Sequence, residues 1–238
     1  ALTIDGGEVR WHVFDEDGEL DQSPATASAD NQPFTTLEGA PLTLFAGDEH
    51  WSAGMMDDIR GFNSILGEDE IVSIYEDTNN EVSGGGGAPS PAAHYSLDGD
   101  NITDEVSGNS GSTKGGVTTG VPGKVGSAFQ FDGEDDSAVM PNAPLGTEQV
   151  TVTGWFNYSG HQDWSRIMQF GADDTKSPNN ENGGWSLEFE GGTNILTCTT
   201  YDGSSKARNA KMQLETDTWY FTALTLDGGE VRWHVFDE

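Results

Sequence analysis

Basic residues, cysteine and long apolar segments are all scarce in this chain of 238 residues. Ten Lys and Arg stand against 41 Asp and Glu, which gives a formal net charge of −31 at pH 7. A surface this negative repels nucleic acid and anionic membranes, so neither is expected as a partner. No stretch approaches the roughly 18 consecutive apolar residues of a membrane-spanning helix, so no membrane insertion is expected in this segment.

The chain has one cysteine, Cys198, which excludes a disulfide within it. This residue lies in the segment NILTCTTYDG, whose composition predicts a strand with a buried thiol. The alternative is a cross-link between repeated copies of the chain.

The acidic residues are spread along the chain rather than gathered in blocks, and only five residues are lysines. This pattern resembles that of proteins from halophilic microbes, because at about 1 M salt the Debye length falls to roughly 3 Å and such a surface becomes tolerable. An acidic disordered tail is the alternative, but it would contain few aromatic residues. Seven Trp, eleven Phe and five Tyr favour a packed core.

One stretch of the chain occurs twice. Residues 223–238, ALTLDGGEVRWHVFDE, repeat residues 1–16, ALTIDGGEVRWHVFDE, with one change, Ile4 against Leu226. The spacing of 222 residues suits a domain-sized unit in a tandem array. The run TWYFTALTL and the following EVRWHVFDE predict two strands of a hairpin joined at DGG, so residue 1 is expected to start in mid-strand.

Short alternating segments separated by Gly and Asp turns predict an all-β fold, an antiparallel two-sheet sandwich. After Leu66 the spacing of apolar residues becomes helical and predicts one short helix. Residues 79–92, NNEVSGGGGAPSPA, predict a linker. The expected strands lie within residues 8–15, 41–48, 52–63, 93–100, 127–140, 150–160, 165–171, 184–192 and 195–203 and in the repeated hairpin.

Placed in the order 93–222 and then 1–78, the motifs form a familiar series. They are AHYSLDGD, GSAFQFDGEDDSAVMP, VTVTGWFNY, GWSLEFEG, DTWYFTALTLDGGEVRWHVFDEDG, APLTLFAGD and MMDDIRGFNSILGEDEIVSIYED. This series resembles the laminin G-like, concanavalin A-like jelly-roll domain. The resemblance implies that residues 1–78 are the C-terminal half of one such domain, and that residues 93–238 are the N-terminal part of the next. A circular permutation is the alternative, in which both halves close within the chain.

The resemblance also implies a structural calcium ion, which many members of the family bind. The matching residues are Asp98, the Asp132-Gly133 turn with Asp135 and Asp136, and Asp57 beside Asp58. Calcium takes six to eight oxygen ligands, so clustered carboxylates and a glycine turn suit it. The first and last strands of a jelly roll are expected to be neighbours, which would bring Asp98 to Asp57. A hydrogen-bonded turn without metal is the alternative.

Glycosidases with this type of sandwich use two carboxylates, and the pair Glu188 and Glu190 is the candidate for such a catalytic site. Their Cβ atoms would lie about 6–7 Å apart on one strand face, which fits only loosely. Sandwich glycosidases place a third acid between a more widely spaced pair, and the five His are scattered. We therefore expect two solvated acids on an outer face, and no enzyme.

Four aromatic residues in or beside expected loops, Trp51, His161, Trp164 and Trp185, are candidates for stacking on a sugar ring. Such tryptophans more often pack in a core or against a loop. Asn101 and Asn157 begin the sequons NIT and NYS, which would fit glycosylation of an exported chain.

The hypothesis that follows is a non-enzymatic extracellular or cell-surface repeat protein. Tandem domains adapted to high salt would build a filament or a multivalent adhesin, because repetition gives length or multivalency. Its partners would be neighbouring copies of the same repeat, and surface glycans or proteins. The alternative is a lectin-like, carbohydrate-binding module of an exported protein.

Overall fold

The computed structural model describes residues 37–79, 89–146, 148–178, 183–228 and 230–237, and within residues 1–36 only the backbone of five short strands. Those five strands are β1 (Leu2–Asp5), β2 (Glu8–Trp11), β3 (Val13–Phe14), β4 (Leu20–Asp21) and β5 (Ala27–Ser28). Fifteen further strands and one helix, α1 (Glu68–Asn79), follow. Within the described residues, no helix is long and apolar enough to span a membrane.

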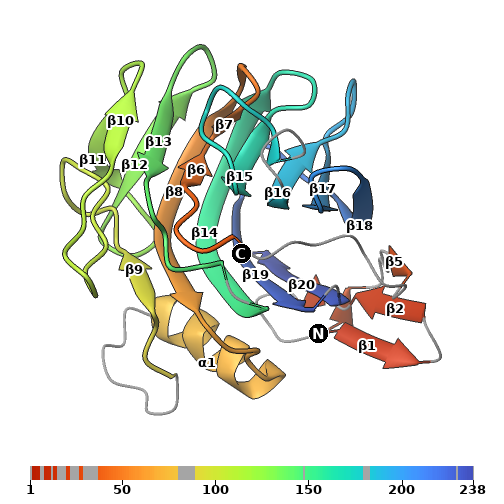
Figure 1. The fold of residues 1–238 in the computed structure, drawn as a ribbon. Helices are drawn as coiled ribbons and strands as arrows, with labels where there is room; N and C mark the ends of the chain where they lie inside the picture. Colours follow the sequence, from red (N-terminus) through yellow and green to blue (C-terminus); the bar gives the residue numbers. More distant parts are fainter. Residues whose placement is uncertain are drawn as a thin grey trace.

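Most of the strands form two antiparallel sheets that face each other (Figure 1). The seven-stranded sheet has the order β10 (Ser112–Lys114), β13 (Ser137–Met140), β6 (Leu42–Leu44), β15 (Arg166–Phe170), β16 (Gly184–Phe189), β17 (Ile195–Tyr201) and β18 (Lys206–Gln213). The eight-stranded sheet has the order β11 (Thr118–Pro122), β12 (Ser127–Asp132), β8 (His50–Phe62), β14 (Gln149–His161), β19 (Trp219–Asp227) and β20 (Glu230–Asp237). The short strands β7 (Ala46–Gly47) and β9 (Ala93–Tyr95) also pair with β8. The predicted antiparallel two-sheet sandwich is confirmed.

The alternation of apolar residues along each strand places the core between the sheets. Strand β16 shows this, because Trp185, Leu187 and Phe189 belong to the buried core cluster. Ser186 and Glu188 alternate with them and therefore lie on the opposite face of the seven-stranded sheet. Their surroundings are polar, as described below.

Helix α1 follows Leu66, as the sequence predicts. Its first turn carries three acids, and the Glu70 carboxylate accepts a hydrogen bond from Gly67 N at 2.8 Å, which stabilises the positive N-terminal end. Ile71 and Ile74 pack in a smaller apolar cluster against Trp155, on the outer face of the eight-stranded sheet. Trp155 Nε1 donates to Thr78 Oγ1 at 2.9 Å, so the end of the helix is also fixed to the sheet.

Segments from the two ends of the chain interleave in the sandwich. Strand β8 lies between β12 and β14, and β6 lies between β13 and β15, so residues 37–79 and 93–237 complete one sandwich within a single chain. Residues 80–88 of the predicted linker lie outside the described residues. The division into halves of two domains therefore stays a prediction, while the chain can close as the permutation alternative requires.

The two copies of the repeated stretch occupy different places. The second copy contributes part of β19 and all of β20, and this hairpin ends the eight-stranded sheet. In the first copy, β1 pairs with β2, and β2 with β5, in a small separate sheet (Figure 1). The sandwich thus takes up one copy of a hairpin that the chain carries twice.

Candidate functional sites

Asp57 and Asp98 are held by the same loop. Asp57 is fully buried in β8, and its Oδ2 accepts a hydrogen bond from Val125 N at 2.7 Å. Asp98 Oδ1 accepts one from Ser127 N, also at 2.7 Å. The loop of residues 123–126 lies so close that a Cβ on Gly123 would collide with Asp57, and one on Gly126 with Asp98. The structure therefore brings together the two carboxylates that the resemblance placed on neighbouring strands.

The surroundings of Asp57 oppose the charge of its carboxylate. Burial raises the pKa of Asp57 to about 7; the charges of Asp58 and Asp98 raise it too, against the lowering hydrogen bonds from the loop. Asp57 Oδ1 is buried and accepts no hydrogen bond. A cation bound between Asp57 and Asp98 would satisfy this oxygen and offset the cost of burying the charge.

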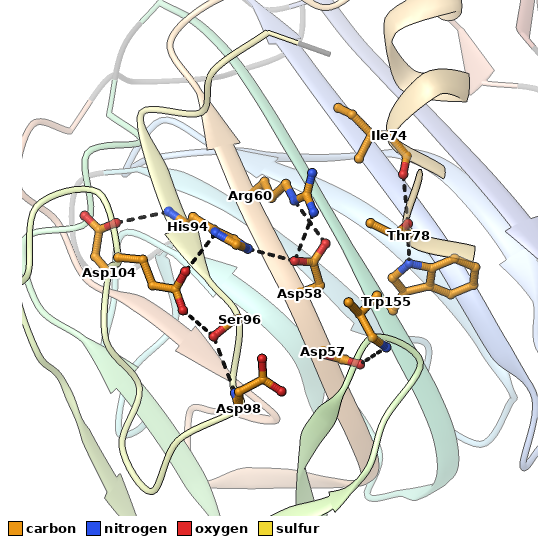
Figure 2. Close-up of polar contacts among 12 residues, drawn as sticks. Asp57, Asp58, Arg60, Ile74, Thr78, His94, Ser96, Asp98, Asp104 and Trp155 are labelled. Atoms are coloured by element: carbon orange, nitrogen blue, oxygen red, sulfur yellow. Dashed lines mark hydrogen bonds and ion pairs between the residues drawn. The ribbon is translucent and has the colours of Figure 1, made fainter. Parts of the chain in front are cut away.

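Asp58, which the sequence also suggested as a metal ligand, is directed to a different set of partners. Its Oδ1 lies 2.7 Å from His94 Nε2, and its Oδ2 forms an ion pair with Arg60 Nε at 3.0 Å (Figure 2). His94 in turn lies 3.2 Å from Glu105 Oε2 through Nδ1. A bulge interrupts β8 here, with φ +45° at Asp58 and a shift of register between Asp57 and Arg60, so the two neighbouring carboxylates have different partners. That Asp58 helps to hold a metal ion stays a prediction.

Asp132, Asp135 and Asp136 form a second acidic cluster, in the turn between β12 and β13. One oxygen from each can be chosen so that all three lie within 4.8 Å of one another, so the triad could hold a metal ion. Asp136 Oδ2 accepts from Asp132 N at 2.9 Å, and burial, with the charges of Asp132 and Asp135, raises its pKa. Strand β12 separates this cluster from Ser127 and the Asp98 carboxylate by about 17 Å at 3.3 Å per residue. The acidic turn is thus separate from Asp98 and its neighbours.

Three of the four candidate aromatic residues gather around the turn between β14 and β15. Gln162 N in this turn donates to Trp51 O at 3.0 Å, and the ring of His161 stacks on Phe189 with centroids 4.2 Å apart. Trp164 is 43 % exposed, while Arg208 lies over its ring at 5.0 Å. Trp164 is therefore the aromatic residue best placed to meet a ligand.

Other candidates are buried. Trp185, expected in or beside a loop, is wholly inside the core, with its ring 6.2 Å from Phe170, so it does not face a ligand at the surface. Asn157 is 5 % exposed in the middle of β14, paired on both sides, and the folded domain does not present it for glycosylation. Asn101 is exposed. Cys198 is fully buried, as predicted, and burial raises its pKa above that of a free thiol.

Glu188 is not the solvated acid that the sequence suggested. It is 1 % exposed, and its carboxylate accepts hydrogen bonds from Thr199 Oγ1 at 3.0 Å and Tyr201 Oη at 2.8 Å. Arg166 and Arg208 each approach it to 3.5 Å. Glu190, by contrast, is partly exposed and forms an ion pair with Lys211. An outward-facing acid is normally solvated, so nothing in the sequence signalled this buried cluster.

Strand β18 carries three of the ten basic residues on one face. Lys206, Arg208 and Lys211 lie opposite Tyr201, Thr199 and Thr197 of β17, on the face that also carries Glu188. Lys211 is three residues after Arg208, so regular alternation would place it on the other face. A bulge shifts the register between Arg208 and Ala210 and brings Lys211 back to the face of Arg208. All three side chains are exposed, and Trp164 borders them. We call Lys206, Arg208, Lys211 and Trp164 the basic face; no sequence pattern predicted the bulge that creates it.

One comparison with known proteins gives a match. Residues 132–235 match the family model Laminin_G_3, described as the Concanavalin A-like lectin/glucanases superfamily. No curated protein and no solved structure matches the chain. The matched segment runs from the end of β12 to β20. Together with the two antiparallel sheets, it supports a domain of the concanavalin A-like lectin/glucanase type.

Proposed function

We propose that this concanavalin A-like lectin/glucanase domain is a non-enzymatic unit of an extracellular, cell-surface protein. Tandem copies of the unit form a filament or a multivalent adhesin in concentrated salt. The observation that carries the proposal is that the sandwich takes up one copy of a hairpin sequence that the chain carries twice. We infer that the second, nearly identical hairpin completes the eight-stranded sheet of a second sandwich.

The packing of the hairpin explains why two copies point to two domains. In the second copy, Leu224, Leu226 and Trp233 are buried in the core between the sheets. The first copy has the corresponding apolar pattern, with Ile4 in place of Leu226, and burying its side chains would require an equivalent sheet. Repetition at this spacing lengthens a protein or multiplies its binding sites, whereas an enzyme gains little from it.

Two further observations support a non-enzymatic role at high salt. Glu188 is held by two hydroxyl groups and two arginines, an arrangement that stabilises a sheet face and leaves no free carboxylate for acid or base chemistry. The net charge of −31 is spread over the surface, which keeps a protein hydrated and separate in concentrated salt.

Electron microscopy of chains with two, four and six periods tests this proposal. The contour length should rise in proportion to the number of periods, because each period adds one sandwich. Regular rods would indicate a filament in which neighbours share strands or the linker, and irregular threads would indicate flexible beads. A contour length that does not grow with the number of periods would sink the proposal.

Calcium belongs to this proposal as a structural ion. Asp57 and Asp98 would hold it, together with carbonyl groups of the surrounding loops. Bound there, calcium would supply positive charge between the two carboxylates. The backbone groups Val125 N and Ser127 N orient these carboxylates. The buried, unpartnered Asp57 Oδ1 supports this assignment.

A lectin-like module is the second candidate function, and the basic face favours it. Trp164 offers an indole to a sugar ring, and its neighbour Arg208 offers a guanidinium, while Lys206 and Lys211 lie along the same strand. In a chain with four acids for every base, such a grouping selects a negatively charged saccharide, one that carries carboxylate or sulfate.

A further inference from the structure

The basic face lies at an edge of the sandwich, where another molecule can reach it. We propose that it docks a second copy of this chain, and that it meets there a surface that we call the acidic hollow. The hollow is an open depression whose polar side chains are Glu38, Asn63, Glu148, Gln149 and Asp227. The proposal rests on the proposed assembly of neighbouring copies, and it names the two surfaces through which they meet.

Strand β18 carries the basic face, and it is the last strand of the seven-stranded sheet (Figure 1). The side chains of Lys206, Arg208 and Lys211 are exposed on its outer face. Two of the three charges are held in position, because Arg208 lies over the Trp164 ring at 5.0 Å and Lys211 is paired with Glu190. Side chains that are already ordered lose less conformational entropy when a partner binds.

The acidic hollow, with a volume of about 610 Å³, lies beside the turn that follows β19. Gln149 Nε2, at the start of β14, donates to Asp227 Oδ1 at 3.1 Å. Gly228 N donates to Glu148 O at 2.9 Å, so the turn is fixed against the segment that leads into β14. Glu38 comes from a third segment. Three separate parts of the chain thus present exposed carboxylates around one depression.

The two surfaces match in sign and in number of charges. Three basic side chains stand on one surface and three carboxylates on the other, and hydrogen bonds between such groups are assisted by charge. Elsewhere the chain is so acidic, with 41 acids and 10 bases, that two copies repel each other in most orientations. The basic face therefore selects the orientation in which two copies can meet.

Contact between these two surfaces is head-to-tail, because the basic face belongs to the seven-stranded sheet and the hollow borders strands of the eight-stranded sheet. Each copy offers its basic face to one neighbour and its hollow to another, so the contact continues into a line of units unless the rotation closes a ring. Neighbours on one chain have an effective concentration in the millimolar range, so a weak contact is sufficient between them.

Salt acts on this contact in two opposite ways. In dilute buffer the net charge of −31 on each copy keeps the copies apart, and this long-range repulsion fades as the Debye length shortens. Directly paired groups from which water is excluded are screened much less. Association should therefore strengthen between about 0.01 and about 0.3 M NaCl.

Cross-linking of the full chain with a carbodiimide locates the contact, because this reagent joins a lysine amine to a carboxylate only where the two touch. At about 0.3 M NaCl and roughly millimolar chain, we expect covalent dimers in which Lys206 is joined to Glu148 or Asp227, identified by mass spectrometry of the peptides. The Lys211–Glu190 ion pair within one chain is the internal positive control.

Sedimentation equilibrium of charge-reversed variants tests the pairing itself. E148K/D227K and K206E/K211E should each associate at least tenfold more weakly than the parent, because like charges then meet. An equimolar mixture of the two variants should regain the association. In the mixture, the basic face of the first variant meets the acidic hollow of the second, and the two reversed surfaces also have opposite charge.

D100K/E134K is the matched control, since it changes the net charge as E148K/D227K does, at exposed acids outside both surfaces, and it should not weaken the association. A mixture that associates no better than each variant alone would overturn the proposal. Cross-links from Lys206 to carboxylates outside the hollow would do the same, as would binding of an acidic saccharide by chains that stay monomeric. If the contour length grows with the number of periods and yet no association is found, the array stands and only this contact is lost.

Discussion

The carboxylate of Asp57 is fully buried in the fold. Its pKa is about 7, against an ordinary value of 3.8 for an aspartate, so the folded chain binds a proton more readily than the unfolded chain between these pH values. A carboxyl group of this kind costs stability as it ionises, so metal-free stability falls as pH rises from about 4 to about 7. At 1.36 kcal/mol per pKa unit the cost is about 4 kcal/mol above pH 7.

Asp57→Asn tests this assignment through the pH dependence of urea unfolding. In chelator at pH 8 the variant should be more stable than the parent chain by up to about 4 kcal/mol, because Asn carries no charge. The difference should vanish below about pH 4, where Asp57 is protonated in both states. Saturating calcium should stabilise the parent more than the variant. A variant that is less stable than the parent at pH 8 in chelator would contradict the account.

Trp164→Ala tests the lectin-like candidate at a single side chain. The variant should lose at least tenfold in affinity for a uronate or sulfated oligosaccharide in molar salt. Its stability should change by less than about 1 kcal/mol, because the residue is partly exposed and lies outside the core cluster. Val106, the other large apolar residue exposed in the described part of the chain, provides the control as V106A. If no glycan binds on an array, or W164A binds as the parent does, this candidate function is abandoned.

At the scale of elements, the hairpin β19–β20 is the part of the sandwich for which the chain holds a spare copy. Trp233 in β20 is buried between the sheets, and its Nε1 donates to Thr222 Oγ1. Leu224 and Leu226 lie beside it in the same cluster. The second copy is thus part of the core, and the sheet formed by β1, β2 and β5 lies outside both sheets of the sandwich.

The duplication supplies a matched pair of variants. Trp233→Ala should lower the free energy of unfolding by about 3–5 kcal/mol, the usual cost of truncating a buried Trp. Trp11→Ala removes the same residue from the first copy and should leave the unfolding of the sandwich unchanged within about 0.5 kcal/mol. Both free energies of unfolding are measured with urea. Equal losses from both variants would contradict the assignment of the second copy, and not the first, to the core of the sandwich.

The contribution of the same hairpin to stability should depend on pH through His234. Burial lowers its pKa to about 4, with help from nearby positive charge including Arg232, so the residue is neutral when folded. A histidine with a lowered pKa contributes stability that is lost as pH falls from about 6.5 to about 4. His234→Gln should therefore flatten the acid limb of the stability curve, and an unchanged acid limb would count against the buried neutral ring.

Sequence patterns predicted the strands and the helix better than they predicted the contacts between them. Alternating runs such as VTVTGWFNYSG gave the strands, and the helical spacing after Leu66 gave α1, because both follow from local periodicity. The burial of Glu188 and the bulge beside Arg208 could not be predicted, since they depend on contacts among β15, β16, β17 and β18. Asp57 and Asp58 are neighbours in sequence, yet a bulge in β8 gives their carboxylates different partners.

At the scale of the whole molecule, the net negative charge is the main factor in how stability depends on salt. A net charge of −31 on 238 residues repels itself in dilute buffer, where the Debye length is about 30 Å at 0.01 M. The repulsion opposes compactness until salt screens it. Paired and buried groups such as Glu188 are screened less, so the salt effect should come mainly from the exposed acids.

Salt titration of thermal unfolding tests this view. The melting temperature should rise by about 10 °C or more between 0.01 and 1 M NaCl, and most of the rise should occur below about 0.3 M, where screening changes fastest. The same concentrations of sucrose, which screens no charge, are the control. A flat salt dependence would contradict the high-salt adaptation.

The central claim is that one domain runs from residue 93 through the repeated hairpin to residue 79, and the reordered chain tests it most directly. Residues 93–222 followed by residues 1–79 contain each strand of the sandwich once, with one hairpin and no linker inside the domain. Calorimetry should show a monomer with a single cooperative transition at a melting temperature no lower than that of the present chain. A reordered chain that unfolds without cooperativity, or only aggregates, would contradict the claim.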